Sequence, residues 1–224
     1  MGTSDSVLDR ITTMIDAGQY RDEILGFPGV ALEGRGNFYG DRRIYRRGSA
    51  ELAEASAQGL VDRLPRLEGA APEAIAEAEA IAGAALPPLL SSLYARANGG
   101  FGPSYGILGL RGGFTDDQGH TAVDILRSAA EGRWPTIPPG LIPLCHWGCA
   151  VYSFVHVPTG IIYGWDPNPV DMDMEVPFFE QEYVLETWLE AWLDGTLHQP
   201  WLLYEPDEGI CRGATIAESR EAFS

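Results

Sequence analysis

A helix with both ends marked lies between Leu86 and Ala97. Three leucines and the final alanine occur at i, i+4, i+7 and i+11, so they share one face of an α-helix. Pro87 and Pro88 suit the first helical positions, where a backbone N–H would have no partner in any case. Asn98-Gly99-Gly100 follows, and these residue types tolerate the left-handed conformation that often ends a helix.

Other segments before residue 135 carry helical spacing or helix-start signals. They cover about residues 6–17, Ser49–Leu64, 72–82 and 124–131. Ser49 and Thr121 are expected N-caps, because a hydroxyl group can accept a hydrogen bond from a backbone N–H of the first turn. Gly59 weakens the second of these helices. The helix that Pro72 opens is expected to pair with the Leu86 helix.

Alternating hydrophobic and polar positions predict strands in the second half of the chain. Residues 150–157 alternate between two sides, Pro158-Thr159-Gly160 has the composition of a hairpin turn, and residues 161–165 return antiparallel. Tyr105–Leu110 is expected to be the first strand of the same sheet.

Phe179–Leu193 is expected to be the last helix of the sheet-and-helix body. One side gathers apolar residues that should pack on the sheet: Val184, Leu185, Trp188, Leu189 and Trp192. The opposite side carries carboxylates spaced by four residues: Glu182, Glu186, Glu190 and Asp194. Like charges at this spacing destabilise a helix slightly. This acidic ridge is either a solvated outer face or a surface that docks a basic partner.

Together these elements predict an α+β protein. We expect a mainly antiparallel sheet of about four to six strands with helices packed on one face, plus an N-terminal helical extension. A length of 224 residues suits one domain with an extension or two small domains. The expected division is an extension over 1–70, the main domain over 71–205 and a tail over 206–224.

The order of motifs resembles the SUKH superfamily, which includes bacterial immunity proteins and relatives of the fungal Smi/Knr cell-wall-synthesis regulators. The resemblance rests on Leu86-Pro87, the Asn98-Gly99-Gly100 helix end, a Leu-Ile-Pro strand at 141–143, Gly-x-x-x-Tyr at 148–152, a hairpin and a late Trp-Leu helix. It spans about residues 73–202. What it implies is an α+β domain that binds proteins without catalysis and often neutralises a toxin made beside it.

The net charge is −17 and is distributed unevenly. No Lys or Arg occurs between Arg133 and Arg212, whereas that stretch holds many carboxylates. Such a field repels nucleic acid and anionic membranes and speeds association with basic proteins. The same charge can simply serve solubility. Within the hypothesis of a basic protein toxin as partner, the expected contact residues are Asp166, Asp171, Asp173, Glu175, Glu182, Glu186, Glu190, Asp194, Asp116 and Asp117, with Trp165 as either an aromatic anchor or a core residue.

Two clusters raise the question of catalysis or metal binding. Asp116, Asp117 and His120 lie in a loop, where two carboxylates and an imidazole could hold a metal, although Asp-Asp in a loop is more often turn chemistry. Cys145 and Cys149 flank His146 without a C-x-x-C pair and are expected to be small apolar core residues. We therefore expect no enzyme activity, metal or cofactor. An intracellular regulatory scaffold and a metal-dependent hydrolase using the first cluster remain the alternatives.

The remaining features bear on location and on the one basic cluster. No apolar run approaches membrane-spanning length, the N-terminus lacks a signal-peptide pattern, and three cysteines do not form an even framework, so we expect a cytoplasmic protein with free thiols. Arg42, Arg43, Arg46 and Arg47 flank aromatic residues, but the net charge argues against RNA binding. Pairing of these arginines with acidic residues of the same chain is at least as good an interpretation.

Overall fold

The computed structural model describes residues 3–24, 27–31, 43–168, 177–205 and 210–222. The strands in these ranges are β1 (Gly29–Ala31), β2 (Ile44–Arg46), β3 (Leu141–Gly148), β4 (Val151–His156), β5 (Ile161–Trp165), β6 (Phe179–Val184), β7 (Leu202–Glu205) and β8 (Ile210–Gly213). The helices are α1 (Thr3–Ala17), α2 (Ala50–Ala57), α3 (Pro72–Ala82), α4 (Pro88–Arg96), α5 (Ala122–Ala130), α6 (Leu185–Leu193) and α7 (Ile216–Ala222). The predicted α+β class is confirmed.

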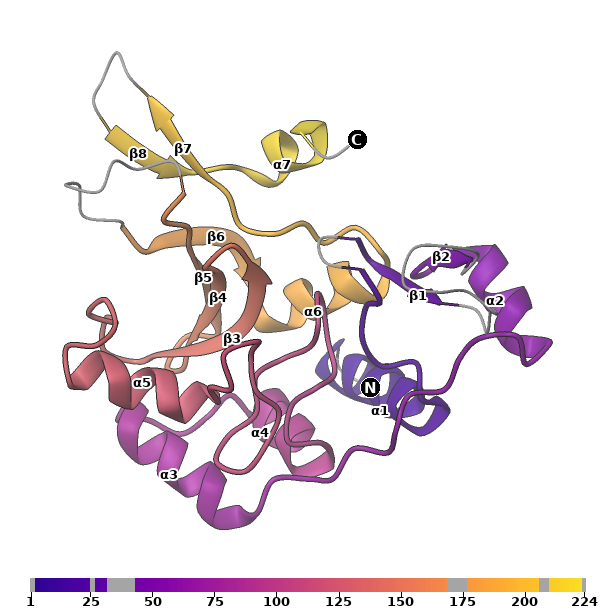
Figure 1. The fold of residues 1–224 in the computed structure, drawn as a ribbon, viewed down its shortest axis with the longest axis horizontal. Coiled ribbons are helices and arrows are strands. Elements are labelled where there is room, and N and C mark those ends of the chain that lie inside the picture. The colour runs from indigo at the N-terminus through magenta and orange to yellow at the C-terminus, as the bar shows by residue number, and fades with distance from the viewer. Residues whose placement is uncertain (1–2, 25–26, 32–42, 169–176, 206–209, 223–224) are drawn as a thin grey trace.

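A four-stranded antiparallel sheet in the order β3-β4-β5-β6 forms the centre of the fold (Figure 1). The predicted hairpin joins β4 to β5, with Phe154 opposite Tyr163. On one face of the sheet the Trp147 indole N–H donates to Ser153 Oγ at 2.9 Å, and the Trp147 ring packs edge-on against Trp188 of α6. Side chains of this face therefore lie against α6.

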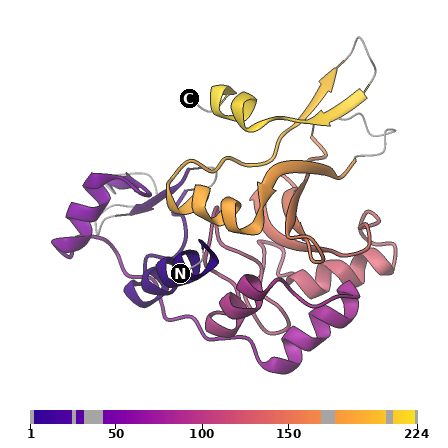
Figure 2. The same ribbon diagram turned by 180° about the vertical axis from the view of Figure 1, so that it is seen from behind.

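Helix α6 lies between the sheet and α1, as Figure 2 shows from behind. Trp188 and Trp192 are fully buried, and the apolar face of α1 joins the same core. At the α6 surface, Ser4 Oγ donates to Glu186 at 3.3 Å and Arg10 pairs with Asp194 at 2.7 Å. Helix α1 thus packs on α6 and shares the core of the main body.

Strands β1 and β2 and helix α2 form a small unit beside this body (Figure 1). It has its own apolar cluster, to which Val30 and Tyr45 belong. The unit is tied to the main core by a buried ion pair between Arg47 Nε and Asp22 at 3.2 Å. Burial raises the pKa of the Asp22 carboxyl and lowers the pKa of the Arg47 guanidinium, and the attraction between the two groups opposes both shifts. The Arg cluster thus includes one residue with a structural role inside the chain.

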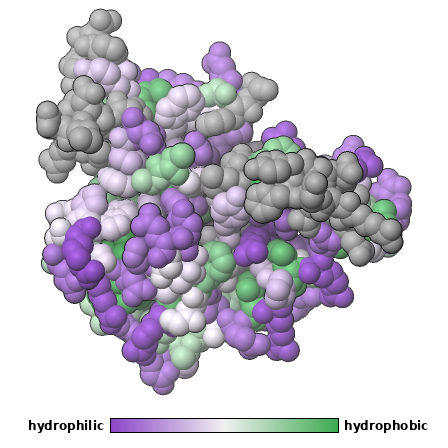
Figure 3. All heavy atoms as spheres, viewed as in Figure 1, coloured by the Kyte–Doolittle hydropathy of each residue, from purple (hydrophilic) through white to green (hydrophobic). Residues whose placement is uncertain are grey.

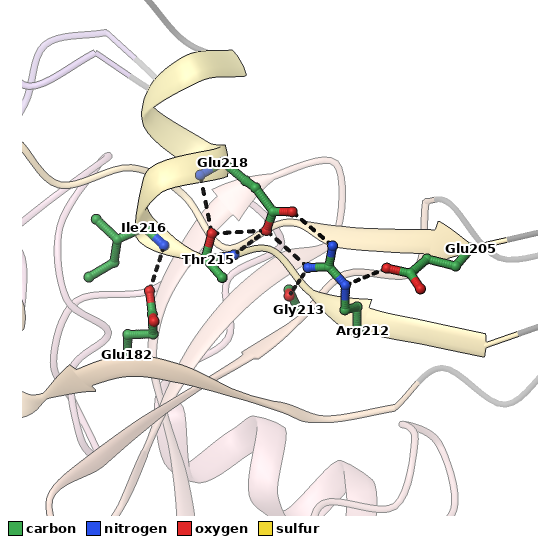
Figure 4. A network of polar contacts seen from close by, with 7 residues as sticks. All are labelled: Glu182, Glu205, Arg212, Gly213, Thr215, Ile216 and Glu218. Carbon is green, nitrogen blue, oxygen red and sulfur yellow. Dashed lines mark hydrogen bonds and ion pairs between the residues drawn. The ribbon is translucent and has the colours of Figure 1, made fainter. Parts of the chain in front are cut away.

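Strands β7 and β8 and helix α7 form a second unit, in which α7 packs beside the β7–β8 hairpin. Figure 4 shows how Arg212 joins Glu205 of β7 to Glu218 of α7, with Arg212–Glu218 contacts of 2.8 and 2.9 Å. The backbone N–H and the hydroxyl of Thr215 both donate hydrogen bonds to the Glu218 carboxylate. These hydrogen bonds lower the pKa of Glu218 to about 2. Residues 210–213 are therefore a strand and 216–222 a helix, tied to β7 through Arg212.

Three predicted elements differ from the structure. Residues 179–184 are strand β6, because Phe179 and Gln181 alternate with exposed Glu180 and Glu182 before the helix begins at Leu185. The predicted strand at 105–110 is an irregular segment with one bridge, from Ile107 to Cys145, since Gly106 adopts a φ of 116°. Helix α2 ends at Ala57, ahead of Gly59.

The two predicted caps are confirmed. Ser49 Oγ accepts a hydrogen bond from the Leu52 N–H, and Thr121 forms a reciprocal capping box with Asp124. None of the helices in the described ranges has the length and apolar character needed to cross a bilayer.

Candidate functional site

The end of α4 shapes a pocket formed by two loops and the end of β3. Gly99 and Gly100 have positive φ, as expected for this helix end. The Asn98 side chain accepts from the Leu110 N–H at 2.8 Å, and its backbone carbonyl accepts from the Phe114 N–H at 2.9 Å. These contacts fold residues 109–114 back against α4 and fix the position of the loop that follows.

We define the loop pocket as the cavity of about 330 Å³ between these segments. Arg21 comes from the chain after α1, and the other contributions come from residues 105–108, residues 114–117 and the β3 end. Tyr105 is 51% exposed at its rim. The guanidinium carbon of Arg21 lies 5.6 Å from the ring centroid of Phe114. The pocket thus combines aromatic surface, one cation and polar groups.

Asp116 lies in this pocket wall with a fully buried side chain. Its Oδ1 accepts hydrogen bonds from the backbone N–H groups of Gln118 and His120, at 2.9 and 2.8 Å. Its Oδ2 accepts from the Tyr152 hydroxyl at 3.1 Å and lies 3.6 Å from the His120 ring. Burial and the Asp116 charge raise the pKa of Tyr152, so the phenol stays protonated as the donor. Asp116 therefore stabilises the loop through a buried carboxylate.

Asp117 is exposed at the same pocket and contacts a different imidazole. Its Oδ1 lies 3.4 Å from His146 Nδ1, and the His146 ring stacks on Tyr152 with centroids 4.6 Å apart. Asp116 and Asp117 are thus directed to separate histidines instead of forming one centre. Within the described ranges, no three His, Cys, Asp or Glu side chains gather in a way that could hold a metal ion.

Trp165 and Asp166 are buried at the end of β5. Trp165 packs against Trp134 with ring centroids 5.0 Å apart. Asp166 Oδ1 accepts from both the backbone and side-chain N–H groups of Asn168, and Oδ2 accepts from the Leu202 N–H at 3.2 Å. Asp166 therefore ties this turn to the start of β7. The predicted contacts Asp171, Asp173 and Glu175 lie outside the described residues.

The predicted acidic ridge is divided between two elements. Glu182 belongs to β6, where its Oε2 accepts from the Ile216 N–H at 2.8 Å. Glu186 and Asp194 are engaged by α1, as described above, so this side of α6 is partly covered by the protein's own chain. Glu190 is half-buried on α6. The carboxylates therefore do not form one continuous solvated row.

A second surface with exposed carboxylates lies on the last two strands of the sheet. Ile161 is paired with Val184, and Tyr163 with Glu180, so these side chains share one side. Glu182 falls on that side by alternation, opposite the buried Gln181. Glu180 and Glu182 are exposed, Val184 is 39% exposed, and the other two residues are half-buried. We call this set the β5–β6 surface: Ile161, Tyr163, Glu180, Glu182 and Val184.

The cysteines adopt different environments. Cys145 is fully buried, as predicted, and burial raises the pKa of its thiol. Cys149 is exposed in the β3–β4 turn at a φ of 48°, so its predicted core position is wrong. Cys149 lies in the turn beyond the ends of β3 and β4, where its side chain faces solvent.

The sequence pattern does not indicate that Arg21, Tyr105 and Phe114 line a common pocket. Each comes from a segment without periodic structure, and only the fold brings them together. One signal was available: Tyr105 and Phe114 are aromatic residues beside glycines in loops, where a ring has few neighbours to bury it.

No protein-family model, curated protein or solved structure matches this chain.

Proposed function

We propose that this protein is a non-catalytic immunity protein, SUKH-like in its order of motifs, that binds a basic bacterial toxin in the cytoplasm and blocks its working surface. The observation that carries the proposal is the absence of Lys and Arg between Arg133 and Arg212 in a chain of net charge −17. A stretch of this length that carries carboxylates and no Lys or Arg favours a positively charged partner.

The β5–β6 surface is the contact area that we propose among the described residues. It places Tyr163 and Ile161 beside two exposed carboxylates, and the Tyr163 hydroxyl donates to Glu180 Oε2 at 3.5 Å. Tyrosine surrounded by polar groups is a common energetic centre of protein interfaces. A basic partner would place Lys or Arg side chains against Glu180 and Glu182. It would place an apolar side chain against Tyr163 at the centre of the surface.

The face of the molecule seen in Figure 3 bears on how a partner could be recognised. Among the residues drawn in colour in Figure 3, hydrophilic residues predominate and hydrophobic ones are scattered. Scattered apolar side chains are normal on a surface and do not mark an interface. Electrostatic attraction would therefore contribute mainly to the rate of encounter, and shape and the central aromatic group to the lifetime of the complex.

Co-expression tests the proposal. The proteins encoded by the two reading frames that flank this gene are produced in a bacterial host with and without this protein, and growth is measured. We expect one of them to stop growth and this protein to restore it. If neither flanking product is toxic, or if growth is not restored, the proposal fails.

Charge reversal locates the contact surface. Glu180→Arg with Glu182→Arg should slow association with the toxin in stopped-flow measurements, whereas Glu54→Arg with Glu68→Arg, exposed positions elsewhere, should leave it near the wild-type rate. Association of the wild type should slow by orders of magnitude from low to high salt. Equal rates for both double variants would exclude the β5–β6 surface as the contact area.

A further inference from the structure

Arg21 is a half-buried cation whose side chain has no acidic partner in the part of the chain that the structure describes. Its guanidinium contacts the Phe114 ring, and no hydrogen bond or ion pair to the side chain is found within the described ranges. The backbone of Arg21, in contrast, is engaged: its carbonyl accepts from Arg47 Nη2 at 2.8 Å. The side chain is therefore held in place by the fold while its five N–H donors remain available to a ligand.

The other charged groups of the loop pocket already have partners. Asp116 is satisfied by four contacts, and Asp117 lies beside His146. Both carboxylates thus have a polar partner, whereas the Arg21 guanidinium has none among the described residues. A planar guanidinium fits a carboxylate through two parallel hydrogen bonds.

The remaining walls suit a flat apolar group. Tyr105 is half exposed at the rim, Phe114 lies under the Arg21 guanidinium, and Leu108 is buried at the wall. A cavity of about 330 Å³ falls within the range of small-molecule sites. Aromatic walls with one oriented charge are the usual composition of such sites.

The neighbouring carboxylates restrict the charge of the ligand. Asp116 and Asp117 line the same cavity, and the chain carries a net charge of −17. The two carboxylates and the net negative charge repel a phosphate dianion or a polyphosphate more strongly than they repel a single carboxylate.

We propose that the loop pocket binds a small organic monocarboxylate, with the carboxylate on Arg21 and a flat apolar body between Tyr105 and Phe114. This site lies outside the β5–β6 surface, and the proposal does not depend on the protein being an immunity protein.

Calorimetric titration of the full chain tests this site with three probes of the same ring: 3-phenylpropionate, phenethylamine and phenyl phosphate. We expect saturable one-to-one binding of the carboxylate, none of the amine, and weaker binding of the phosphate. Absence of carboxylate binding overturns the proposal. Equal binding of the amine, or tighter binding of the phosphate, overturns it as well.

Two variants and a control locate the probe. Arg21→Gln should weaken 3-phenylpropionate binding about tenfold to a hundredfold, the loss expected for charge-assisted hydrogen bonds. Tyr105→Ser should also weaken it, and this rim position can change without disturbing the core. Arg111→Gln removes an exposed arginine outside the pocket and should leave binding unchanged. Equal affinity for wild type and Arg21→Gln would place the probe elsewhere and refute the assignment.

Discussion

The guanidinium carbon of Arg47 lies 4.5 Å from the ring centroid of Trp192, and both side chains donate to Oδ1 of Asp22. The second carboxylate oxygen accepts from the Ser104 N–H at 3.0 Å. Four segments distant in sequence therefore meet at one buried carboxylate. This contact holds the β1–β2–α2 unit against the α6 side of the main core.

Arg47→Met should destabilise the protein by about 3–5 kcal/mol, because it leaves the buried Asp22 without its charged partner. Urea unfolding at neutral pH measures this loss. Since burial raises the pKa of Asp22, the carboxyl of the variant can take up a proton on folding at low pH. The stability linked to that proton is present below the unfolded pKa and is lost as the pH rises, so the deficit should be larger at pH 8 than at pH 5.

Arg46→Met serves as the matched control, because the Arg46 guanidinium donates to the Gly195 carbonyl instead of a carboxylate. It should cost less than about 1.5 kcal/mol, the range of a single hydrogen bond. Similar losses for the two variants would contradict a special role for the Asp22 contact.

Gly109→Ala should destabilise the protein severely, because a Cβ at Gly109 would lie 2.3 Å from the Phe114 backbone N and 2.5 Å from the Asn98 carbonyl oxygen. These distances are shorter than van der Waals contact, so the backbone of Phe114 or Asn98 would have to move. Gly112→Ala meets nothing within 4 Å and should cost only about 1–2 kcal/mol for its positive φ. Thermal unfolding of both variants compares them, and a smaller loss for Gly109→Ala than for Gly112→Ala would show that this loop packs differently.

Asp116→Asn should cost about 1–3 kcal/mol, because one amide N–H2 would replace an oxygen that now accepts hydrogen bonds in a buried position. Asp117→Asn, with its side chain 71% exposed, should change stability by less than about 0.5 kcal/mol. Chemical unfolding measures both, and equal effects would mean that the Asp116 network contributes no net stability.

Acid should release α7 before it unfolds the main body. The pKa of Glu218 is lowered to about 2 from a usual value of 4.5, so its contribution is present above pH 4.5 and is lost as the pH falls toward 2. Amide hydrogen exchange of Thr215 and its neighbours follows this loss. In Glu218→Gln the protection of these amides should be low at neutral pH and should change little with acid; full protection in that variant would contradict the assignment.

Thiol labelling with Ellman's reagent should proceed in steps. Cys149 is exposed and should react first, and half-buried Cys211 more slowly. Cys145 should react only on unfolding, because it is buried and its pKa is raised. In Cys149→Ser the fast phase should disappear. A fast phase that persists in this variant would assign it to another cysteine.

The sequence predicts helix ends correctly where the residues that form them are close together in the chain. The α4 boundaries follow from Pro87, Pro88 and the glycines, and the Thr121 cap is readable because its partner Asp124 is three residues away. Val184 continues the apolar spacing of α6 backward, so the sequence pattern predicts a helix over 179–184 as well. The alternating burial that makes them a strand depends on pairing with β5, which a helical pattern does not report.

The candidate site was harder to predict because its geometry is nonlocal. Asp116 and Asp117 are adjacent in sequence, yet one is buried by Tyr152 and the other is exposed beside His146. Loop charge gives no sign of that difference. Arg21 and Phe114 meet only after α1 and α4 have packed together.

The packing of α1 against α6 also determines when the molecule can complete its core. The contacts from Ser4 to Glu186 and from Arg10 to Asp194 span 182 and 184 positions. On the ribosome, the part of α1 that packs on α6 must therefore wait until Trp188 and Trp192 have been synthesised, whereas the contact of α1 with α4 can form earlier. The core can therefore be completed only after the tryptophan-bearing segment leaves the exit tunnel.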